Sequence, residues 1–579
     1  MTWKQLYQKN KIWNSLIILF SVIGLLVCIT LLFPQVRAMI LDTFEQKRQR
    51  EIFIYQSLFS LLLSFAMGGI CIILFFNYLK FTNSGRSLVK KVRLEIKDCI
   101  SDIDYRSFIK PVLLMFIIYL LGVLTIIRAN FTYLDDMARV LVGNREWSYM
   151  SRYLADFLSI FIHGDTVLKD IAPLPLLISI FILAVSNVLL VYIICNKKIP
   201  IIGLLASIPL GLSPYFLECL SFKFDTPHMA LSILAGIVPF LFIVRQKAFL
   251  FVSVLSLLVM CMTYQASSGV YMMIAIMLCF QYWNKKEKTN KEILSFFGVS
   301  IFAFCITMLI FRLFLMMPLT EQHFLYVSNS MHPLPQIISG TMGNIKNYAI
   351  TINNDFGIIW KIGILLIFLF FIIQSTFRST QKKILSFFIS IIFIGLSFFL
   401  SFGGYSLLTM PIFYPRALFG FGVFLAILCI NVVSGYKTIS KVIVLALNWC
   451  FIVFAFSYGN ALADQARYAD FRIGILLHDL STLYPDRNME DMSFTIENTI
   501  EYTPSINNIS KHYPVIERLV PRRLGFNAHD FIYCFQHFNY AYYKNLSDKE
   551  DISDLPVVLD SYYHTIKSDE EHVLIILKH

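Results

Sequence analysis

Long apolar segments recur along most of this chain, and they limit its fold more than any other feature. Each is close to the roughly 20 residues that a helix needs to cross the hydrocarbon of a bilayer. With 57% hydrophobic residues and a mean hydropathy of +0.67, the chain is far more apolar than a soluble domain. The sequence therefore predicts a polytopic α-helical membrane protein with about 13 transmembrane helices. The predicted spans are 13–33, 53–79, 111–127, 171–195, 199–212, 229–244, 248–263, 268–283, 293–316, 357–374, 384–402, 417–434 and 439–457.

Lysine and arginine are distributed unevenly over the connections between these segments. With the N-terminus in the cytoplasm, the inner connections hold 23 Lys and Arg in 71 residues, whereas the outer loops hold 11 in 135. Cytoplasmic loops carry such an excess of cations, so this orientation is the predicted one. The net charge of +12 is then mainly a topology signal. Because the cations are scattered through short loops and form no patch, nucleic-acid binding is not expected.

Three regions follow from this pattern. Residues 1–107 form an N-terminal pair of spans with a cytoplasmic loop, and 108–457 form a multi-span core whose first large outer loop is 129–170. The odd number of spans places 458–579 outside the cytoplasm. That region begins as a helix (458–486) and contains two predicted strands (493–504 and 572–579), which indicates a small α/β domain.

Two adjacent carboxylates, Asp135 and Asp136, lie in the first large outer loop. Acidic residues close to a bilayer are costly to keep and are therefore functional candidates. One alternative is that they cap a helix N-terminus, where carboxylates interact favourably with the helix dipole. A cap accounts for one of them and leaves the second, beside Arg139 and Arg152, unexplained. The apolar residues that follow recur at helical spacing and predict an amphipathic helix along the outer membrane surface: Trp147, Met150, Leu154, Phe157 and Phe161.

The next two outer loops also concentrate polar residues. Glu218, Lys223 and Asp225 lie in the loop 213–228, and Tyr264 and Gln265 lie in a short turn whose groups suit sugar hydroxyls. Mixed charges are common in any short polar loop, so a purely structural role is the alternative for each of these five residues.

Four cations lie at or inside the outer ends of predicted spans: Arg128, Arg312, Lys361 and Arg416. A single cation at a bilayer edge can extend its charged end to water. Four on the same side indicate instead a zone that binds an anion at the interface, and a lipid phosphate is the obvious candidate because arginine offers it a bidentate fork. The middle of the membrane carries few ionisable groups, which weighs against an ion-coupled transporter.

Eleven cysteines form neither a disulfide framework nor a zinc site, because most lie in apolar spans and none has ligand spacing. Two adjacent acids leave open whether a divalent metal, Mg²⁺ or Mn²⁺, bridges carboxylates and phosphate. No other cofactor is expected.

Four stretches carry a family resemblance: LDDMARVLVGNREWSYMSRYL (134–154), SPYFLECLSFKFDTPHMALS (213–232), TYQAS (263–267) and SYGNALADQARYADF (457–471). In this order they resemble the bacterial Gtr-type (glucosyl transferase type II) enzymes that modify O-antigen and cause serotype conversion. One departure is Ser151 before Arg152, where the family has glycine before arginine.

The resemblance implies a GT-C-like inverting glycosyltransferase in the bacterial inner membrane. Such an enzyme moves a hexose, here glucose, from a polyprenyl-phosphate donor to a cell-surface polysaccharide such as the O-antigen of lipopolysaccharide, on the periplasmic side. An enzyme that loads glucose onto polyprenyl phosphate and a flippase are the further partners that it implies, besides membrane lipids. The acidic motif of the family's first outer loop corresponds to Asp135 and Asp136.

In that reading Asp136 is expected to deprotonate the acceptor hydroxyl, with Asp135 orienting it or the acceptor. Substrate contacts are expected from Arg139, Arg152, Glu218, Lys223, Asp225, Tyr264 and Gln265, and lipid-phosphate contacts from Arg312, Arg416, Lys361 and Arg128. Two other classes stay open: a polysaccharide polymerase or ligase that acts on whole repeat units, and a flippase or transporter for lipid-linked sugars.

Overall fold

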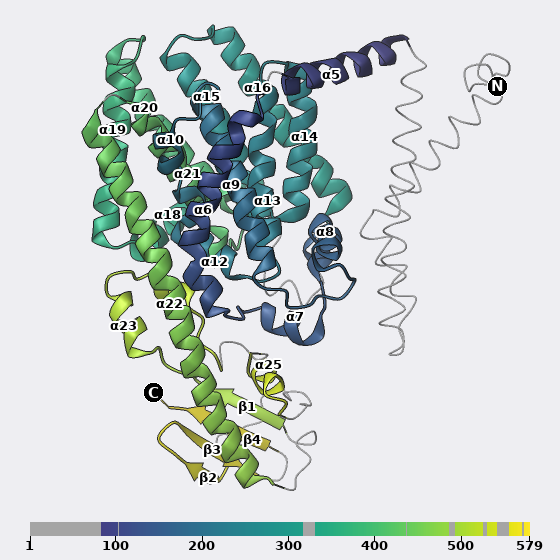
Figure 1. The fold of residues 1–579 in the computed structure, drawn as a ribbon, viewed down its shortest axis with the longest axis vertical. Helices are drawn as coiled ribbons and strands as arrows, with labels where there is room; N and C mark the ends of the chain where they lie inside the picture. The colour runs from purple at the N-terminus through teal and green to yellow at the C-terminus, as the bar shows by residue number, and fades with distance from the viewer. Residues whose placement is uncertain are drawn as a thin grey trace, which may run out of the picture.

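The computed structural model describes residues 83–101, 103–316, 331–435, 437–485, 493–524, 530–540, 555–569 and 572–578. The first two predicted spans, 13–33 and 53–79, lie outside the described residues. The described chain forms a bundle of helices, and a small β-sheet lies beyond one end of it (Figure 1). The protein is therefore mostly helical, as its apolar segments predict.

Eight helices in the described part of the chain are long and apolar enough to cross a membrane. They are α6 (Arg106–Ala129), α9 (Leu174–Ile194), α14 (Gln246–Thr263), α15 (Ser268–Asn284, extended by the turn before it), α16 (Asn290–Ile310), α19 (Ile358–Phe377), α20 (Lys383–Ser401) and α22 (Thr438–Leu483). The predicted number of 13 spans is not confirmed. Three predicted spans, 199–212, 229–244 and 417–434, form shorter helices: α10 (Ile201–Ala206) with α11 (Pro209–Leu212), α13 (Thr226–Ile237) and α21 (Gly420–Val433).

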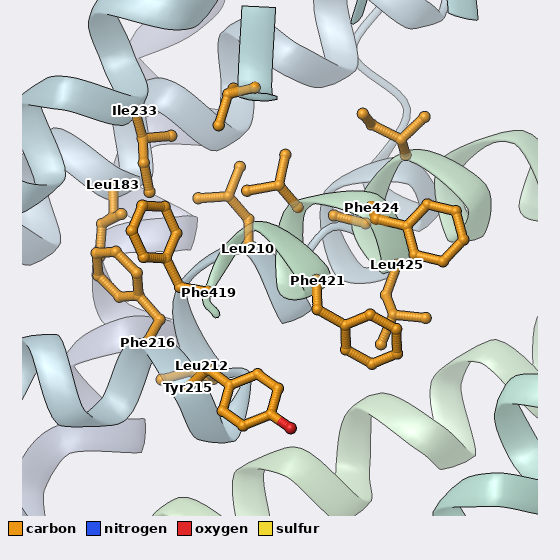
Figure 2. Packing of buried hydrophobic residues seen from close by; sticks show 14 of the residues in the cluster. Leu183, Leu210, Leu212, Tyr215, Phe216, Ile233, Phe419, Phe421, Phe424 and Leu425 are labelled. Carbon is orange, nitrogen blue, oxygen red and sulfur yellow. The ribbon is translucent and has the colours of Figure 1, made fainter. Parts of the chain in front are cut away.

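These short helices lie in the middle of the bundle. Nearly every residue of α21 is buried, as expected of a helix that is apolar on all sides. Figure 2 shows its Phe421 and Phe424 among the buried side chains, with Phe419 just before it against Phe216. The Phe216 and Phe419 rings meet edge to face at 5.4 Å. This central layer is therefore surrounded by other helices and not by lipid.

The segment 213–228 is not the exposed loop that the sequence analysis expects. Pro214 begins a helix, α12 (Pro214–Ser221), which is bent by 60° from the α10–α11 segment before it. Ser213 is extended between the two, and proline at the first helical position favours a new helix start. Every residue from 213 to 228 is buried. The polar side chains of this segment therefore lie inside the protein, where they need partners.

The last long helix crosses α6 very closely. A Cβ on Gly459 of α22 would lie 2.5 Å from the carbonyl carbon of Thr125, and Thr125 Oγ1 donates a hydrogen bond to the Ala455 carbonyl at 3.3 Å. Small residues let helix backbones approach in this way. α22 then continues beyond the bundle to Leu483, which confirms the helix predicted after the last span.

The remaining elements are mostly short and connect the long helices. The helices are α5 (Asn83–Ser101), α7 (Asp136–Val142), α8 (Tyr153–His163), α18 (Ile337–Asp355), α23 (Pro504–Ser510), α24 (Ile516–Leu519) and α25 (Asp530–His537). Single turns are η1 (Trp147–Met150), η2 (Val238–Phe242), η3 (Gln265–Ser267), η4 (Phe311–Leu315), η5 (Leu334–Gln336), η6 (Gly403–Leu407) and η7 (Pro415–Ala417). Trp147 is thus not on α8: the chain turns at Ser151 (φ +60°), which divides the predicted amphipathic helix in two.

The sheet has four strands in the order β1-β4-β3-β2, with β1 (Ser493–Glu497) parallel to β4 (His572–Leu577). β3 (His564–Ser568) pairs antiparallel with both β4 and β2 (Val557–Asp560). The two segments predicted as strands therefore contain β1 and β4. The sheet packs its apolar face on the end of α22, where Ile473 and Leu476 share one buried cluster with Ile566 and Ile575.

A buried arginine ties this sheet to α22. Arg472 pairs with Glu501 at 2.7 Å and donates hydrogen bonds to the carbonyls of Tyr563 (2.7 Å) and Lys578 (2.9 Å). We expect Arg472→Met to lower the local stability of the sheet by about 2–4 kcal/mol, somewhat less than for a fully buried pair because Glu501 is partly exposed. Arg467→Met on the same helix is the control, since its pair with Asp464 is exposed and should contribute ~0–1 kcal/mol. Hydrogen exchange of the β3 and β4 amides measures the difference, and equal exchange in the two variants would contradict the assignment.

Candidate active site

The acidic pair lies in a strained turn between α6 and α7. Asn130 ends α6 in the left-handed conformation (φ +43°), and Leu134 has φ +39°, which is rare for a leucine. Asp135 occupies the N-cap position of α7 without making a side-chain cap hydrogen bond. Asp135 is exposed, whereas Asp136 is completely buried. The two carboxylates therefore have different surroundings, and helix capping does not explain Asp135.

Asp136 is a packing partner of the chain between α12 and α13. Its Oδ2 accepts a hydrogen bond from the Lys223 backbone N–H at 2.7 Å, and its Oδ1 lies 3.9 Å from Arg139 Nη1. Burial raises the pKa of Asp136 well above its ordinary value, against the opposing effect of Arg139. This carboxyl joins two segments inside the protein.

Arg139 and Asp225 form a second buried link between the same segments. They make a close ion pair, and Trp147 Nε1 donates to Asp225 Oδ1 at 2.5 Å. The Arg139 guanidinium also lies 4.6 Å from the centre of the Trp147 ring. Burial pushes the pKa of Asp225 upward, but Arg139, Trp147 and Arg152 together hold it below its ordinary value. Asp225 is therefore an ionised partner of Arg139.

Arg152 connects this region to the short turn before α15. Its Nε donates to Gln265 Oε1 at 3.1 Å, and its guanidinium lies 4.6 Å from the Tyr264 ring. Gln265 in turn donates to the Met150 carbonyl at 3.1 Å. The Tyr264 hydroxyl donates to the Arg416 carbonyl at 3.0 Å. The first outer loop, which carries Arg152, is thus in contact with the short turn that carries Tyr264 and Gln265.

Arg416 and Glu218 complete this group of polar residues around the acidic turn, which we call the cluster. The Arg416 backbone N–H donates to Glu218 Oε2, and Arg416 Nη1 lies 3.9 Å from Glu218 Oε1. Nη1 is buried and has no hydrogen-bond partner among the described residues. Although burial lowers it, the pKa of Arg416 is raised overall, first by Asp135 and then by Glu218. Arg416 therefore has one guanidinium nitrogen without a hydrogen-bond partner among the described residues, and the Asp135 carboxylate favours its charged form.

A cavity of about 250 Å³ lies next to this cluster, between the end of α6, the start of α9 and the end of α12. Its lining is mainly apolar, with Asn130, Ser221 and Lys223 as polar members: Ile126, Ile127, Asn130, Phe131, Ala172, Pro173, Pro175, Leu176, Leu220, Ser221, Phe222 and Lys223. Lys223 Nζ pairs with Asp170 at 2.7 Å, and Phe222 lies 5.0 Å from the Arg416 guanidinium. The cavity thus adjoins both the acidic turn and the central arginine.

The structure brings together ten of the thirteen selected residues: Asp135, Asp136, Arg139, Arg152, Glu218, Lys223, Asp225, Tyr264, Gln265 and Arg416. The other three cations have different neighbours. Arg128 donates to the Asn460 side chain, and the exposed Arg312 donates to Met316 Sδ at 2.9 Å. Lys361 is half-buried in the first turn of α19.

Other residues of the cluster were not selected from the sequence. Tyr133 donates to the Leu519 carbonyl at 2.7 Å, and Arg523 donates to the Thr132 carbonyl at 2.6 Å. His228 lies 5.3 Å from Trp147, and neither of its ring nitrogens has a hydrogen-bond partner within the described residues. The one sequence signal for Arg523 is the cationic run 518–523, which lies far from the acidic pair along the chain.

Among the described residues, no group of three or more His, Cys, Asp and Glu side chains is arranged to hold a metal ion. The divalent metal considered for the acidic pair stays a prediction.

Comparisons with known proteins identify the family. A fold of long apolar helices with acids and arginines gathered at one end fits a membrane glycosyltransferase, and the family model of the glucosyl transferase GtrII matches residues 124–433. The chain belongs to the GtrII glucosyl transferase family. It is also 24% identical, over 435 residues, to the "uncharacterized 55.3 kDa protein in gtrB 5'region" of Salmonella phage P22; the match covers 72% of this chain and 87% of that relative. No solved structure matches the chain.

Proposed function

We propose that this protein transfers a hexose, glucose by its family, from a polyprenyl-phosphate donor to a cell-surface polysaccharide on the periplasmic side of the inner membrane. The observation that carries the proposal is the exposed Asp135 together with the partly exposed Arg416 side chain, whose pKa the Asp135 carboxylate raises. A base and an anion-binding cation at one site are what an inverting transfer from a phosphate requires. The uneven distribution of cations supports the periplasmic side.

In the proposed reaction, the oxygen of the acceptor hydroxyl forms a bond to C1 of the donor sugar while its proton passes to Asp135. The bond between C1 and the phosphate oxygen breaks, and its electron pair leaves with the polyprenyl phosphate. Arg416 is placed to stabilise that charge. The sugar configuration at C1 inverts because attack and departure take place on opposite faces.

Asp135 suits the role of base better than Asp136. A base must reach the hydroxyl that it deprotonates, and Asp135 is exposed whereas Asp136 is fully buried. Asp136 is also engaged by the Lys223 N–H. We therefore assign proton transfer to Asp135, in place of the Asp136 expected from sequence, and assign Asp136 to holding the turn.

The other residues of the cluster have proposed roles by position. Next to Arg416, the side chains of Arg152 and Gln265 carry N–H donors, and Tyr264 carries an aromatic ring and a hydroxyl. We assign these three side chains to contacts with the sugar and its hydroxyls. The apolar cavity beside Phe222 suits the first isoprene units of the donor lipid. Contacts of Arg312, Lys361 and Arg128 to lipid phosphate, a divalent metal, and a donor-loading enzyme and flippase as partners stay predictions.

Glycan analysis of the host with and without this gene tests the function. We expect the surface polysaccharide to gain one hexose per repeat unit when the gene is present, and to lose it when polyprenyl-phosphate glucose cannot be made. A change in chain length without a change in the repeat unit would instead indicate a polymerase or ligase. No change in the glycan, with the protein present in the membrane, would contradict the proposal.

A further inference from the structure

The acidic turn is held by a segment far along the sequence, residues 515–524, which we call the strap. The strap lies beyond the part of the chain that matches the family model, 124–433. It contains α24 and three arginines, Arg518, Arg522 and Arg523. Two of these arginines contact the loops that carry the proposed base and the proposed phosphate cation.

One end of the strap fixes the acidic turn on both sides of Leu134. The Tyr133 hydroxyl donates to the Leu519 carbonyl at 2.7 Å, and Arg523 Nη2 donates to the Thr132 carbonyl at 2.6 Å. The Arg523 guanidinium also lies 4.7 Å from the Phe131 ring, and its Nη1 lies 2.8 Å from Met137 Sδ. These contacts span residues 131–137, which include both aspartates.

The turn needs such contacts because its backbone is unfavourable. Asn130 and Leu134 both have positive φ, and Leu134 directly precedes Asp135. A leucine in this region costs of the order of 1–3 kcal/mol, and it persists only where the surroundings fix the chain. The strap supplies part of that constraint, and the Lys223 N–H that holds Asp136 supplies another part.

The other end of the strap fixes the loop that leads to Arg416. Arg518 donates to the Phe413 carbonyl and pairs with Asp355, which is itself bonded to the Tyr215 hydroxyl at 2.8 Å. The Val515 N–H donates to the Asp355 carbonyl at 3.2 Å. A single short segment therefore contacts the turn before Asp135 and the loop before Arg416.

We propose that the strap sets the separation of Asp135 from Arg416, with Arg523 as a positioning residue for the acidic turn. This inference rests on the proposed function, because it assigns a role to Arg523 in that reaction. Arg523 acts through the backbone at Thr132 and through Phe131, and it need not touch either substrate. Displacement of a base by about 1 Å is enough to cost up to 10²-fold in rate.

The test compares four single substitutions in the full-length protein in membranes: Arg523→Ala, Arg523→Lys, Tyr133→Phe and Arg522→Ala. Arg523→Ala removes the hydrogen bonds from Arg523 to the turn. Tyr133→Phe removes the hydroxyl that donates to the Leu519 carbonyl at 2.7 Å and that also lies 3.4 Å from Glu218 Oε1. Arg522→Ala is the matched control: Arg522 stacks on Tyr502 at 4.2 Å, and the Tyr502 hydroxyl keeps its own hydrogen bonds to the Glu517 and Val520 carbonyls of the strap when the guanidinium is removed. Transfer from a polyprenyl-phosphate glucose donor is measured at equal amounts of membrane protein.

We expect Arg523→Ala to lower kcat by about 10–100-fold with less than about a 3-fold change in the donor KM, because the base is displaced while the lipid site is kept. Tyr133→Phe should lower kcat by roughly 3–10-fold, and Arg523→Lys should recover part of the Arg523→Ala loss. Arg522→Ala should stay within about 2-fold of the parent.

Two outcomes overturn the inference. The first is a kcat of Arg523→Ala and Tyr133→Phe equal to that of Arg522→Ala. The second is a rise in the donor KM of Arg523→Ala that accounts for its whole loss of kcat/KM, with kcat unchanged. That result would make Arg523 a donor-binding residue. If Arg523→Ala does not accumulate in membranes, Arg523→Lys and Tyr133→Phe are compared with Arg522→Ala instead, and a kcat equal to that of the control in both variants overturns the inference. Asp135→Asn separates the two proposals: full activity of that variant would contradict the proposed function, whereas its inactivity beside a normal Arg523→Ala would contradict only the strap.

Discussion

Asp135→Asn is expected to lower glucosyl transfer by about 10²–10⁴-fold, the usual contribution of a general base. The amide keeps the size and the exposed position of the side chain, and it cannot accept the proton of the acceptor hydroxyl. Asp135 makes no cap hydrogen bond to α7, so the helix start should not change. Initial rates in membranes from a host without its own copy of the gene measure the effect.

Asp136→Asn, one residue along, is the matched control and should stay within about 10-fold of the parent. The amide oxygen can still accept the Lys223 N–H, and Arg139 keeps its partner Asp225. The raised pKa of Asp136 also means that its ionised form is unfavourable in the folded protein: the stability that its protonation provides is full at low pH and is lost as the pH rises through the raised pKa. Removal of that charge should therefore not lower stability at neutral pH.

Equal losses of activity in Asp135→Asn and Asp136→Asn would contradict the division of roles between the two aspartates. An active Asp135→Asn would exclude Asp135 as the base.

The sequence predicts the long helices well because their signal is local. A run of apolar residues identifies a span wherever it occurs, and eight of the predicted spans are single long helices. The same signal fails for the middle of the bundle. The apolar run at 417–434 forms a 14-residue helix surrounded by protein, and hydropathy cannot distinguish that environment from lipid.

The segment 213–228 shows a second limit. Its charges indicate a loop in water, yet Glu218 and Asp225 are buried in contact with arginines from other parts of the chain. Their partners, Arg416 and Arg139, are 198 and 86 residues away. Pairing over such distances satisfies buried charge and leaves no periodic pattern in the sequence. The structure brings these residues into contact with other selected residues, but their exposure was predicted wrongly.

The contacts of the strap were not predicted at all. Arg523 reaches the acidic turn across 391 residues, and the run RLVPRR has no feature that distinguishes it from an ordinary basic surface segment. The amphipathic pattern from Trp147 to Phe161 was also misleading, because Ser151 adopts a left-handed conformation and separates Trp147 from α8. In both cases the tertiary contacts of individual side chains decide the structure.

Arg416→Ala is expected to lower transfer by about 10²–10³-fold, and Arg416→Lys by about 10–100-fold. The reason is that the guanidinium is placed to stabilise charge that develops only as the phosphate departs. Lysine keeps the charge and loses the planar fork that binds two phosphate oxygens. The local backbone should survive either change, because the bonds from the Arg416 N–H to Glu218 and from Tyr264 to the Arg416 carbonyl involve main-chain atoms. Arg467→Ala, at an exposed position on α22, is the control for a lost surface arginine.

The division of this loss between kcat and the donor KM decides what Arg416 does. An interaction made mainly in the transition state lowers kcat and kcat/KM together, whereas one made equally with the bound donor raises KM at constant kcat. We expect the first pattern, because Asp135 and Glu218 already offset the charge of Arg416 before the donor phosphate gains its extra negative charge. Measurement of rates over a range of donor concentrations in detergent or nanodiscs separates the two. A raised KM with an unchanged kcat would make Arg416 a donor-binding residue, and unchanged kinetics in Arg416→Ala would remove it from the site.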